Sequence, residues 1–191
     1  MEQNRLLNMK IPLILLIIGS SCIRWQKNDA ETLNDTLFNR TIVFPTSLHP
    51  LKGDVFDNVD TTLYTLEGKL KVISIIDGIC MTCIIEQLNK MDMIFSEIMK
   101  NKTNTQMVFI LNVHSRDSSY FIHNLQPAIQ AKGIILWDSN YNFETVNQLF
   151  TPDINSRTFL LDRENKIILY GNPIMKPELL IKYKEKLEQC F

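Results

Sequence analysis

The sequence has no strong excess of either charge. Its 191 residues include 20 lysines and arginines against 21 aspartates and glutamates, which gives a formal net charge of −1. It also lacks a run of basic residues, the usual mark of a nucleic-acid-binding surface. The chain contains no internal repeat and no low-complexity segment. We therefore expect one globular domain of ordinary size, with no nucleic-acid partner.

No apolar run is long enough to cross a bilayer. The most hydrophobic segment, residues 11–18 (IPLILLII), falls well short of the roughly 20 apolar residues that a membrane-spanning helix needs. It follows Arg5 and Lys10 and precedes small residues at 19–21. A positive start, a short apolar run and small residues before a cleavage point are typical of a secretory signal. We therefore expect residues 1–21 to be a signal peptide.

The end of this segment resembles the lipobox of bacterial lipoproteins. The small residues lead directly into Cys22, although Gly19 stands where these proteins usually carry leucine. The resemblance implies that the Cys22 thiol is acylated and becomes the new N-terminus; an ordinary signal or an uncleaved anchor are the alternatives. Residues 22–40 would then be a lipidated tether ending in a short helix, and residues 41–191 the folded domain. We therefore expect the protein in the bacterial cell envelope, anchored to a membrane and facing the periplasm.

Cysteine is scarce, since the chain has four. Cys22 is assigned to lipid, and Cys190 is the penultimate residue and is interpreted as a spare thiol. The other two are Cys80 and Cys83, in the stretch DGICMTCIIEQL. In an exported protein such a pair can persist as a disulfide. Three uses of the pair are open: a redox centre, half of a metal site or a structural staple.

Too few ligands accompany the pair for a zinc site. Structural zinc takes four protein ligands, and the chain has no second C-x-x-C. The three histidines lack zinc-finger spacing; they are His49, His114 and His123. A staple is disfavoured because so short a loop removes little entropy from the unfolded chain. Redox exchange is the preferred interpretation, and we expect no metal and no cofactor.

Hydrophobic periodicity predicts alternating strands and helices. Continuous apolar, β-branched runs such as residues 70–76 (LKVISII) indicate strands buried on both faces. Apolar residues from Ile84 to Ile98 recur every three or four positions, as in a helix with one buried face. Strands are expected at 41–45, 70–76, 106–113, 134–138, 157–162 and 166–171, helices at 84–98, 115–133, 142–150 and 176–190, and a loop at 46–58. This order favours a parallel sheet covered on both faces, with an antiparallel strand at its end.

Sheets of this kind place their sites at the carboxyl ends of the parallel strands. Three such ends are visible in the sequence. The first leads from Asp77 to Cys80, the second ends at His114 and the third ends at Asp138. We therefore expect the residues of the site to come from these segments.

Together these features resemble the thioredoxin fold. A buried strand leads into C-x-x-C at a helix start, two βα units follow, and TFLLD, another strand and a helix close the chain. The extra βα unit around IILWDSNYNFETVNQLF looks like the insertion of TlpA/ResA-type thiol-disulfide oxidoreductases and of peroxiredoxins. With TIVFP and TFLLDRENKIILYGNP, the pair also resembles a group of bacterial thioredoxin-like lipoproteins. The resemblance covers about residues 40–190. It implies a three-layer α/β sandwich with a mixed central sheet, helices on both faces and the inserted βα unit.

The resemblance gives the two cysteines separate roles. A helix start has free N–H groups and the positive end of the helix dipole, which can lower a cysteine pKa from about 8.5 to between about 3.5 and 7.5. Cys80 is then the nucleophile that forms a mixed disulfide, and Cys83 is the resolving thiol. Glu86, three residues after Cys83, stands where TlpA/ResA-type proteins often carry a proton-handling glutamate. It is either that group or a solvated helix carboxylate.

Several family positions hold other residues here. Ile79 replaces the tryptophan common before the first cysteine, and Ser74 replaces a buried aspartate. Ser156 stands where the family usually has a cis-proline that shapes the partner groove; a trans bond is expected because a non-proline cis bond costs roughly 3 to 4 kcal/mol. The expected groove residues are Ser156, Arg157 and His114. Arg157 either points inward, where it lowers a thiolate pKa, or faces solvent. His114 is either a general base or a polar cap on a strand end.

The implied activity is thiol-disulfide exchange in the cell envelope. A membrane-anchored oxidoreductase would exchange with the thiols or disulfides of client proteins, in a reducing or isomerising direction, and would need a membrane electron donor. The alternative is a non-enzymatic thioredoxin-fold lipoprotein that acts as a binding or assembly module, which the residues at 79 and 156 favour. A peroxidase is disfavoured, because Asp77 rather than threonine stands three residues before Cys80.

Overall fold

The computed structural model describes residues 37–52, 55–56, 65–78, 80–149 and 154–190. The chain divides into two compact units, Met1–Ala30 and Glu31–Phe191, and every described residue belongs to the second. The expected signal peptide, Cys22 and most of the expected tether therefore lie outside the described residues. The last residues of that tether, 37–40, form a bend and a turn.

The described residues contain seven strands and several helices. The strands are β1 (His49–Lys52), β2 (Val55–Phe56), β3 (Leu70–Asp77), β4 (Thr105–Asn112), β5 (Ile134–Trp137), β6 (Thr158–Leu161) and β7 (Ile167–Tyr170). The α-helices are α2 (Met81–Ile98), α3 (Ser118–Tyr120), α4 (Asn142–Asn147) and α5 (Glu178–Gln189). Shorter 3₁₀ and π segments are η1 (Ser115–Asp117), η2 (Phe121–Leu125), η3 (Gln126–Ala128) and η4 (Ile154–Arg157). In this part of the chain, no helix combines the length and the apolar character that crossing a membrane requires.

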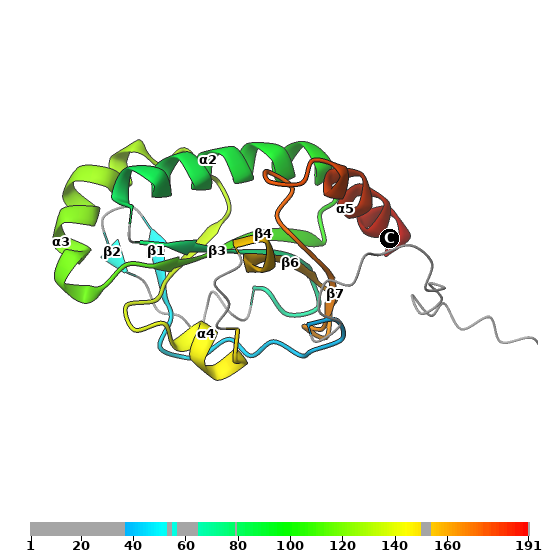
Figure 1. Ribbon diagram of the computed structural model, residues 1–191, viewed down its shortest axis with the longest axis horizontal. Helices are drawn as coiled ribbons and strands as arrows, with labels where there is room; N and C mark the ends of the chain where they lie inside the picture. The colour runs from blue at the N-terminus through cyan, green and yellow to red at the C-terminus, as the bar shows by residue number, and fades with distance from the viewer. Residues whose placement is uncertain (1–36, 53–54, 57–64, 79, 150–153, 191) are drawn as a thin grey trace, which may run out of the picture. The chain divides into compact units, whose positions relative to one another are not determined.

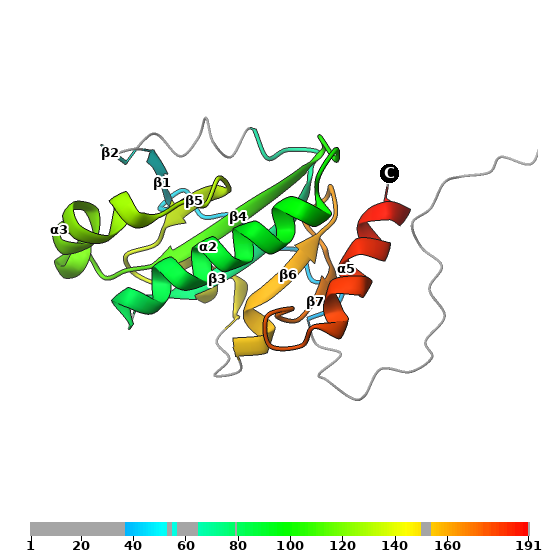
Figure 2. The same cartoon turned by 90° about the horizontal axis from the view of Figure 1, so that it is seen from above.

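The strands form a mixed sheet in the order β2-β1-β5-β4-β3-β6-β7. β3, β4 and β5 are parallel neighbours, while β6 pairs antiparallel with both β3 and β7. β1 lies antiparallel to β5. Figure 2 shows α2 lying across β3 and β4, with α5 beside β7. The carboxyl ends of the parallel strands share one edge of the sheet, as the sequence predicted.

Side chains of the central strands alternate between two hydrophobic cores. In β3, Val72 and Ile76 belong to the core that also contains the buried side chains of α2 and α5. Ile73 and Ile75 belong to the other core, together with Phe143 of α4. In Figure 1, α2 and α5 lie on one side of the sheet and α4 lies on the other. The predicted α/β sandwich, with a mixed sheet and helices on both faces, is confirmed.

The predicted apolar stripe of α2 is buried except at its last member, Ile98, which is half-buried. Ile84, Leu88, Met91 and Phe95 are each 2% exposed or less, with the spacing of one helical face. Burying a side chain of this size contributes about 1.5 to 3 kcal/mol. The stripe therefore fixes α2 on the sheet, and the first turn of α2 carries the cysteine pair.

The segment at 41–45, predicted as a strand, forms little regular structure. Thr41 makes an isolated antiparallel bridge to Lys166. Beyond it, the side chain of Asn147 occupies both backbone groups of Val43: the Val43 N–H donates to Asn147 Oδ1 at 2.8 Å, and Asn147 Nδ2 donates to Val43 O at 2.7 Å. A side-chain amide thus takes the place of a neighbouring strand.

Two further expectations for the loops and helices need correction. Residues 46–58, predicted as loop, contain β1 and β2, with Pro50 opposite Leu136 of β5. The helix predicted at 115–133 is instead a series of short segments from η1 to η3, which ends just after Pro127. Proline lacks the N–H group that would continue the hydrogen bonding of a longer helix. Both differences lie away from the cysteine pair in sequence.

Side chains of α2 hold the stretch that was expected to continue that helix. Asn89 Oδ1 accepts the N–H groups of Gln130 and Ala131 at 2.8 and 3.1 Å. The Asp92 carboxylate accepts those of residues 132 and 133 at 3.0 and 2.9 Å. These four consecutive N–H groups bond to α2 rather than to a helical turn of their own.

Lys71 is a charged residue inside the sheet. It lies on β3, is 1% exposed, and its ammonium group donates to Lys69 O at 2.6 Å. Burial lowers the Lys71 pKa to about 8, and the nearby charges of Asp162 and Glu164 offset part of this effect. Holding this residue charged therefore costs stability near neutral pH.

Lys71→Met is expected to raise the free energy of unfolding at pH 7 by about 2 kcal/mol, because no charge is then buried. In the wild type the folded chain releases this proton near pH 8 and the unfolded chain near pH 10.5, so stability rises between these values. The variant should lack that rise. Denaturant unfolding from pH 6 to 10.5 measures both effects, with the exposed Lys182→Met as control. If the stability of Lys71→Met rises equally over this pH range, the rise comes from another titrating group.

Candidate active site

The cysteine pair joins the end of β3 to the start of α2. Cys80 and Cys83 form a disulfide, with Cα atoms 5.2 Å apart. Cys80 is the N-cap residue of α2, and its carbonyl accepts the N–H of Ile84 at 3.2 Å. The first turn of α2 has no acidic residue, so no carboxylate there offsets the positive end of the helix dipole. This setting favours a thiolate once the disulfide is reduced.

The two cysteines differ in exposure. Cys80 is exposed, whereas Cys83 is half-buried one turn further along the helix. Another molecule can therefore approach Cys80 more easily than Cys83. This arrangement suits the predicted nucleophile and resolving thiol, whose roles in the reduced protein stay predictions.

Gly78 lets the loop before Cys80 pack directly on β4. Its N–H donates to Asn112 O at 2.7 Å. A Cβ atom at this position would lie 2.1 Å from the same oxygen and 3.0 Å from Val113 Cα. The approach is closer than any side chain permits, so glycine is required for this packing. It fixes the path of the chain from β3 to the cysteine pair.

A group of polar side chains lies at the same edge of the sheet. We call it the Arg157 cluster; it consists of Asp77, Asn112, Glu144 and Arg157. Arg157 Nη1 donates to Asp77 Oδ2 at 3.1 Å, and its Nη2 lies 3.6 Å from Glu144 Oε1. Asn112 Nδ2 donates to Glu144 Oε2 at 2.6 Å. β3, β4, α4 and η4 each contribute one of these side chains.

Glu144 is the buried acid of this cluster. Burial raises the pKa of Glu144; the Arg157 charge and the hydrogen bond from Asn112 lower it, and the charges of Asp77 and Asp138 raise it again. Within the described part of the chain, Glu144 Oε1 has no hydrogen-bond partner, since its contact with Arg157 is a longer ion pair. Glu144 therefore holds a proton more readily than a solvated glutamate does.

Asp138, at the end of β5, sets the position of α4. It is fully buried. Its carboxylate accepts the N–H groups of Asn140, Asn142 and Phe143 at 3.3, 3.0 and 2.7 Å. Hydrogen bonds to an ionised carboxylate are among the stronger ones in proteins. They place the start of α4, and with it Glu144, beside the end of β4.

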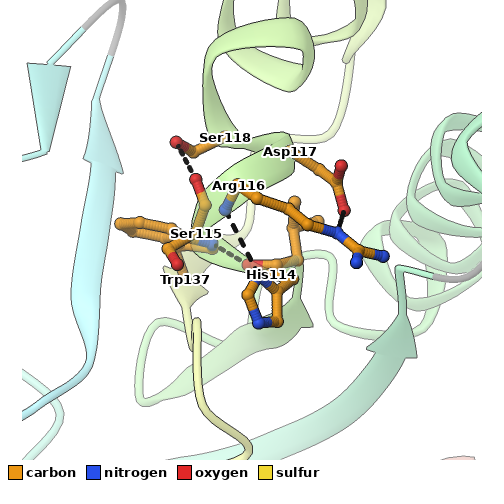
Figure 3. Close-up of polar contacts among 7 residues, drawn as sticks. His114, Ser115, Arg116, Asp117, Ser118 and Trp137 are labelled. Carbon is orange, nitrogen blue, oxygen red and sulfur yellow. Dashed lines mark hydrogen bonds and ion pairs between the residues drawn. The ribbon is translucent and has the colours of Figure 1, made fainter.

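His114 lies at the surface just after β4. Its Nδ1 accepts the N–H of Arg116 at 3.2 Å, so it caps the short helix η1 (Figure 3). The indole N–H of Trp137 donates to the carbonyl of Val113 at 2.6 Å and ties this turn to β5. His114 thus caps η1 just after the end of β4. Its role as a general base stays a prediction.

The remaining predicted residues have different surroundings. Glu86 is exposed on α2, and its proton-handling role stays a prediction. Ser156 is half-buried, and the described peptide bonds are trans, as expected at this position. The hydroxyl of Ser74, which replaces the family's aspartate, lies 3.4 Å from that of Thr158. Arg157 points inward, toward two carboxylates.

Two residues of the site were not predicted. Asn112 ends a continuously buried strand, and a polar residue at that point was a signal available in the sequence. Glu144 lies in a short polar helix, where sequence alone indicates a solvated side chain. Cys190, after α5, is a half-buried thiol. Among the described residues, no three histidine, cysteine or acidic side chains are grouped so as to hold a metal ion.

Comparison with known proteins gives matches in structure alone. No protein-family model matches the sequence, and no curated protein does. A candidate thiol:disulfide interchange protein DsbE from Chlorobium tepidum is 16% identical, with a TM-score of 0.52 over 80% of this chain and 99% of that one. A thioredoxin-like protein from Porphyromonas gingivalis is 19% identical, with a TM-score of 0.52 over 80% and 97%. AhpC from Enterococcus faecalis is 16% identical, with a TM-score of 0.56 over 80% and 95%.

These likenesses concern the fold. At such low identity a shared structure carries the architecture and leaves substrates and partners open. The matches span nearly the whole length of each neighbour. The mixed sheet and the β5–α4 unit inserted between β4 and β6 agree with the architecture predicted from the sequence. The chain has a thioredoxin-like fold.

Proposed function

We propose that the protein is a membrane-anchored thiol-disulfide oxidoreductase of the bacterial cell envelope, which exchanges disulfides with client proteins. The observation that carries the proposal is the Cys80–Cys83 disulfide at the start of α2, with Cys80 exposed. The pair follows the carboxyl end of a parallel strand, where such sheets place their sites. The thioredoxin-like fold supports this activity, and one structural neighbour is described as a candidate thiol:disulfide interchange protein.

The reaction starts from the reduced pair. Cys80 gives up its proton and attacks one sulfur of a client disulfide; the client S–S bond breaks, and the second client sulfur leaves and is protonated. Cys83 then gives up its proton and attacks Cys80 Sγ. The Cys80–Cys83 disulfide forms, and the first client sulfur leaves and is protonated. In total, two electrons and two protons pass from the cysteine pair to the client.

The oxidised pair must be reduced again before the next cycle. The proposal assigns this step to a membrane dithiol donor, which supplies two electrons and two protons by the same exchange. The apolar run at 11–18 and the residues leading into Cys22 support export and lipidation. Anchoring at the membrane would keep the domain near its donor. In an oxidising compartment, that supply would allow the protein to reduce or isomerise client disulfides.

The test uses the full chain, which the proposal expects in the membrane fraction of the bacteria that produce it. In detergent, the protein should accelerate the reduction of a protein disulfide by dithiothreitol. The Cys80 pKa, measured from the pH dependence of alkylation, should lie below the value of about 8.5 of an ordinary cysteine. Equilibration with glutathione gives the reduction potential. A value well below that of the strong oxidant DsbA, about −120 mV, supports the reducing or isomerising direction.

Two results together would contradict an oxidoreductase: an ordinary Cys80 pKa and no acceleration of protein-disulfide reduction. The non-enzymatic alternative would then be favoured, because the chain departs from the family at Ile79 and Ser156. Recovery of the protein in the soluble fraction would contradict the anchor and leave the redox proposal to be decided by the other measurements.

A further inference from the structure

The segment before β6 lies against β3, the strand that leads to the cysteine pair. β6 is antiparallel to β3, and their pairing ends with Ser74 opposite Thr158. Because the strands are antiparallel, the start of β6 lies next to the end of β3, which leads to Cys80. η4 ends at Arg157, directly before β6, and contacts β3. A molecule that docks at Cys80 would therefore approach the edge of the sheet where η4 lies.

Charged contacts hold η4 where the ladder ends. The last paired residues have hydroxyls 3.4 Å apart. One residue further, Arg157 Nη1 donates to Asp77 Oδ2 at 3.1 Å, and Arg157 Nη2 lies 3.6 Å from Glu144 Oε1. The Arg157 side chain is 20% exposed and that of Glu144 is 2% exposed. The guanidinium thus joins the start of the cysteine loop to α4 in a largely desolvated position.

We propose that Arg157 is a positioning residue of the redox site. It fixes η4 against the loop that begins at Asp77, and so holds in place the surface beside Cys80 on which a client segment docks. In this chain residue 156 is a serine, and the ion pairs of the next residue, Arg157, hold the segment. The inference rests on the proposed function, because it concerns how clients of the cysteine pair are bound.

The geometry favours arginine over lysine. A planar guanidinium presents its N–H groups at fixed angles, so two carboxylates can each meet a different nitrogen. A lysine ammonium is a point charge on a flexible stem and can satisfy one of them well. Glu144 cannot follow a shorter or more mobile partner, because Asn112 holds its other oxygen at 2.6 Å. Loss of Arg157 would also leave Asp77 and the buried Glu144 without a shared cation.

The test compares Arg157→Met and Arg157→Lys with the wild-type full chain. Reduction of a protein disulfide (insulin) and of a small aromatic disulfide (DTNB) is measured in parallel. We expect Arg157→Met to lower kcat/KM for insulin by about tenfold or more, mainly through KM, since misplaced binding groups cost this much. The rate with DTNB should stay within about twofold. Arg157→Lys should recover part of the loss.

Arg163→Met is the matched control, because it removes an exposed arginine from the turn between β6 and β7. It should behave like the wild type. An equal loss with both disulfides would indicate a general structural role for Arg157 and overturn the proposal, as would no loss with either. If Arg157→Met does not fold, Glu144→Gln takes its place. It keeps the side-chain shape and removes one of the two charges, so a smaller loss with insulin alone is expected.

Amide hydrogen exchange of residues 154–158 separates this inference from the proposed function. It should be about tenfold faster in Arg157→Met than in the wild type, because the contacts that hold η4 are gone. Unchanged exchange would overturn the positioning role whether or not the protein is an oxidoreductase. A wild type that reduces neither disulfide would overturn the proposed function, and faster exchange in the variant would still show that Arg157 holds η4.

Discussion

Cys80→Ser is expected to lower catalysed disulfide exchange by about 1000-fold or more, because serine offers no thiolate to form the mixed disulfide. Cys83→Ser should behave differently. It keeps the exposed nucleophile and lacks the thiol that resolves the intermediate, so a mixed disulfide with the client should accumulate. Non-reducing electrophoresis detects the adduct, and mass spectrometry of its peptides identifies the cysteine to which the client is joined.

Cys190→Ser is the matched control for these variants. This half-buried thiol lies at the end of α5, and its loss should leave exchange unchanged. Trapping of clients through Cys83 in Cys80→Ser would reverse the assigned roles. Normal biological function of the double variant Cys80→Ser, Cys83→Ser would instead favour a binding or assembly module that does not use its thiols.

Gly78→Ala should lower the stability of the domain strongly. The added Cβ would lie 2.1 Å from Asn112 O and 3.0 Å from Val113 Cα, which are backbone atoms of the β4 end. They cannot turn aside as a side chain would. Relief of the clash requires the loop to move and to break the 2.7 Å hydrogen bond from Gly78 to Asn112. We expect the free energy of unfolding to fall by about 2 to 4 kcal/mol in denaturant titration.

Gly68→Ala separates crowding from backbone strain. Gly68 has a φ of +65°, and a Cβ there would meet no atom within 4 Å. Its cost of about 1 kcal/mol reflects the left-handed backbone conformation alone. A loss in Gly78→Ala no greater than that in Gly68→Ala would show that the loop can move without penalty. The alkylation rate of reduced Cys80 should also differ between Gly78→Ala and the wild type, because Cys80 lies on the same loop.

The central elements were predictable because local pattern and final environment agree. β3 and β4 are buried on both faces, so each appears in the sequence as a continuous apolar run, and α2 shows its buried face as a regular stripe. β1 was missed because HPLK has neither pattern, and its pairing depends on β5, far along the chain. The segment at 41–45 looked like a strand, yet the Asn147 side chain determines its hydrogen bonding. A single sequence cannot indicate such a distant partner.

The position of the candidate site was also predictable from the sequence, but the surroundings of its side chains were not. The C-x-x-C motif located the disulfide, and the rule for parallel sheets located Asp77 and Asp138. The sequence did not indicate that Glu144, in a short polar helix, is buried. Nor did the sequence decide the direction of Arg157, which it allows to point inward or outward. Those properties depend on how β3, β4, α4 and η4 meet, which is a feature of the tertiary structure.

The contacts between α2 and residues 130–133 limit how the molecule can respond to a change of redox state. Asn89 and Asp92 together bind four consecutive backbone N–H groups of that stretch. The middle of α2 is thereby fastened to the chain that leads into β5, and its apolar stripe is fastened to the core. Making or breaking the Cys80–Cys83 bond therefore cannot shift the helix as a rigid rod. We therefore expect any structural difference between the oxidised and the reduced pair to be confined to the first turn of α2.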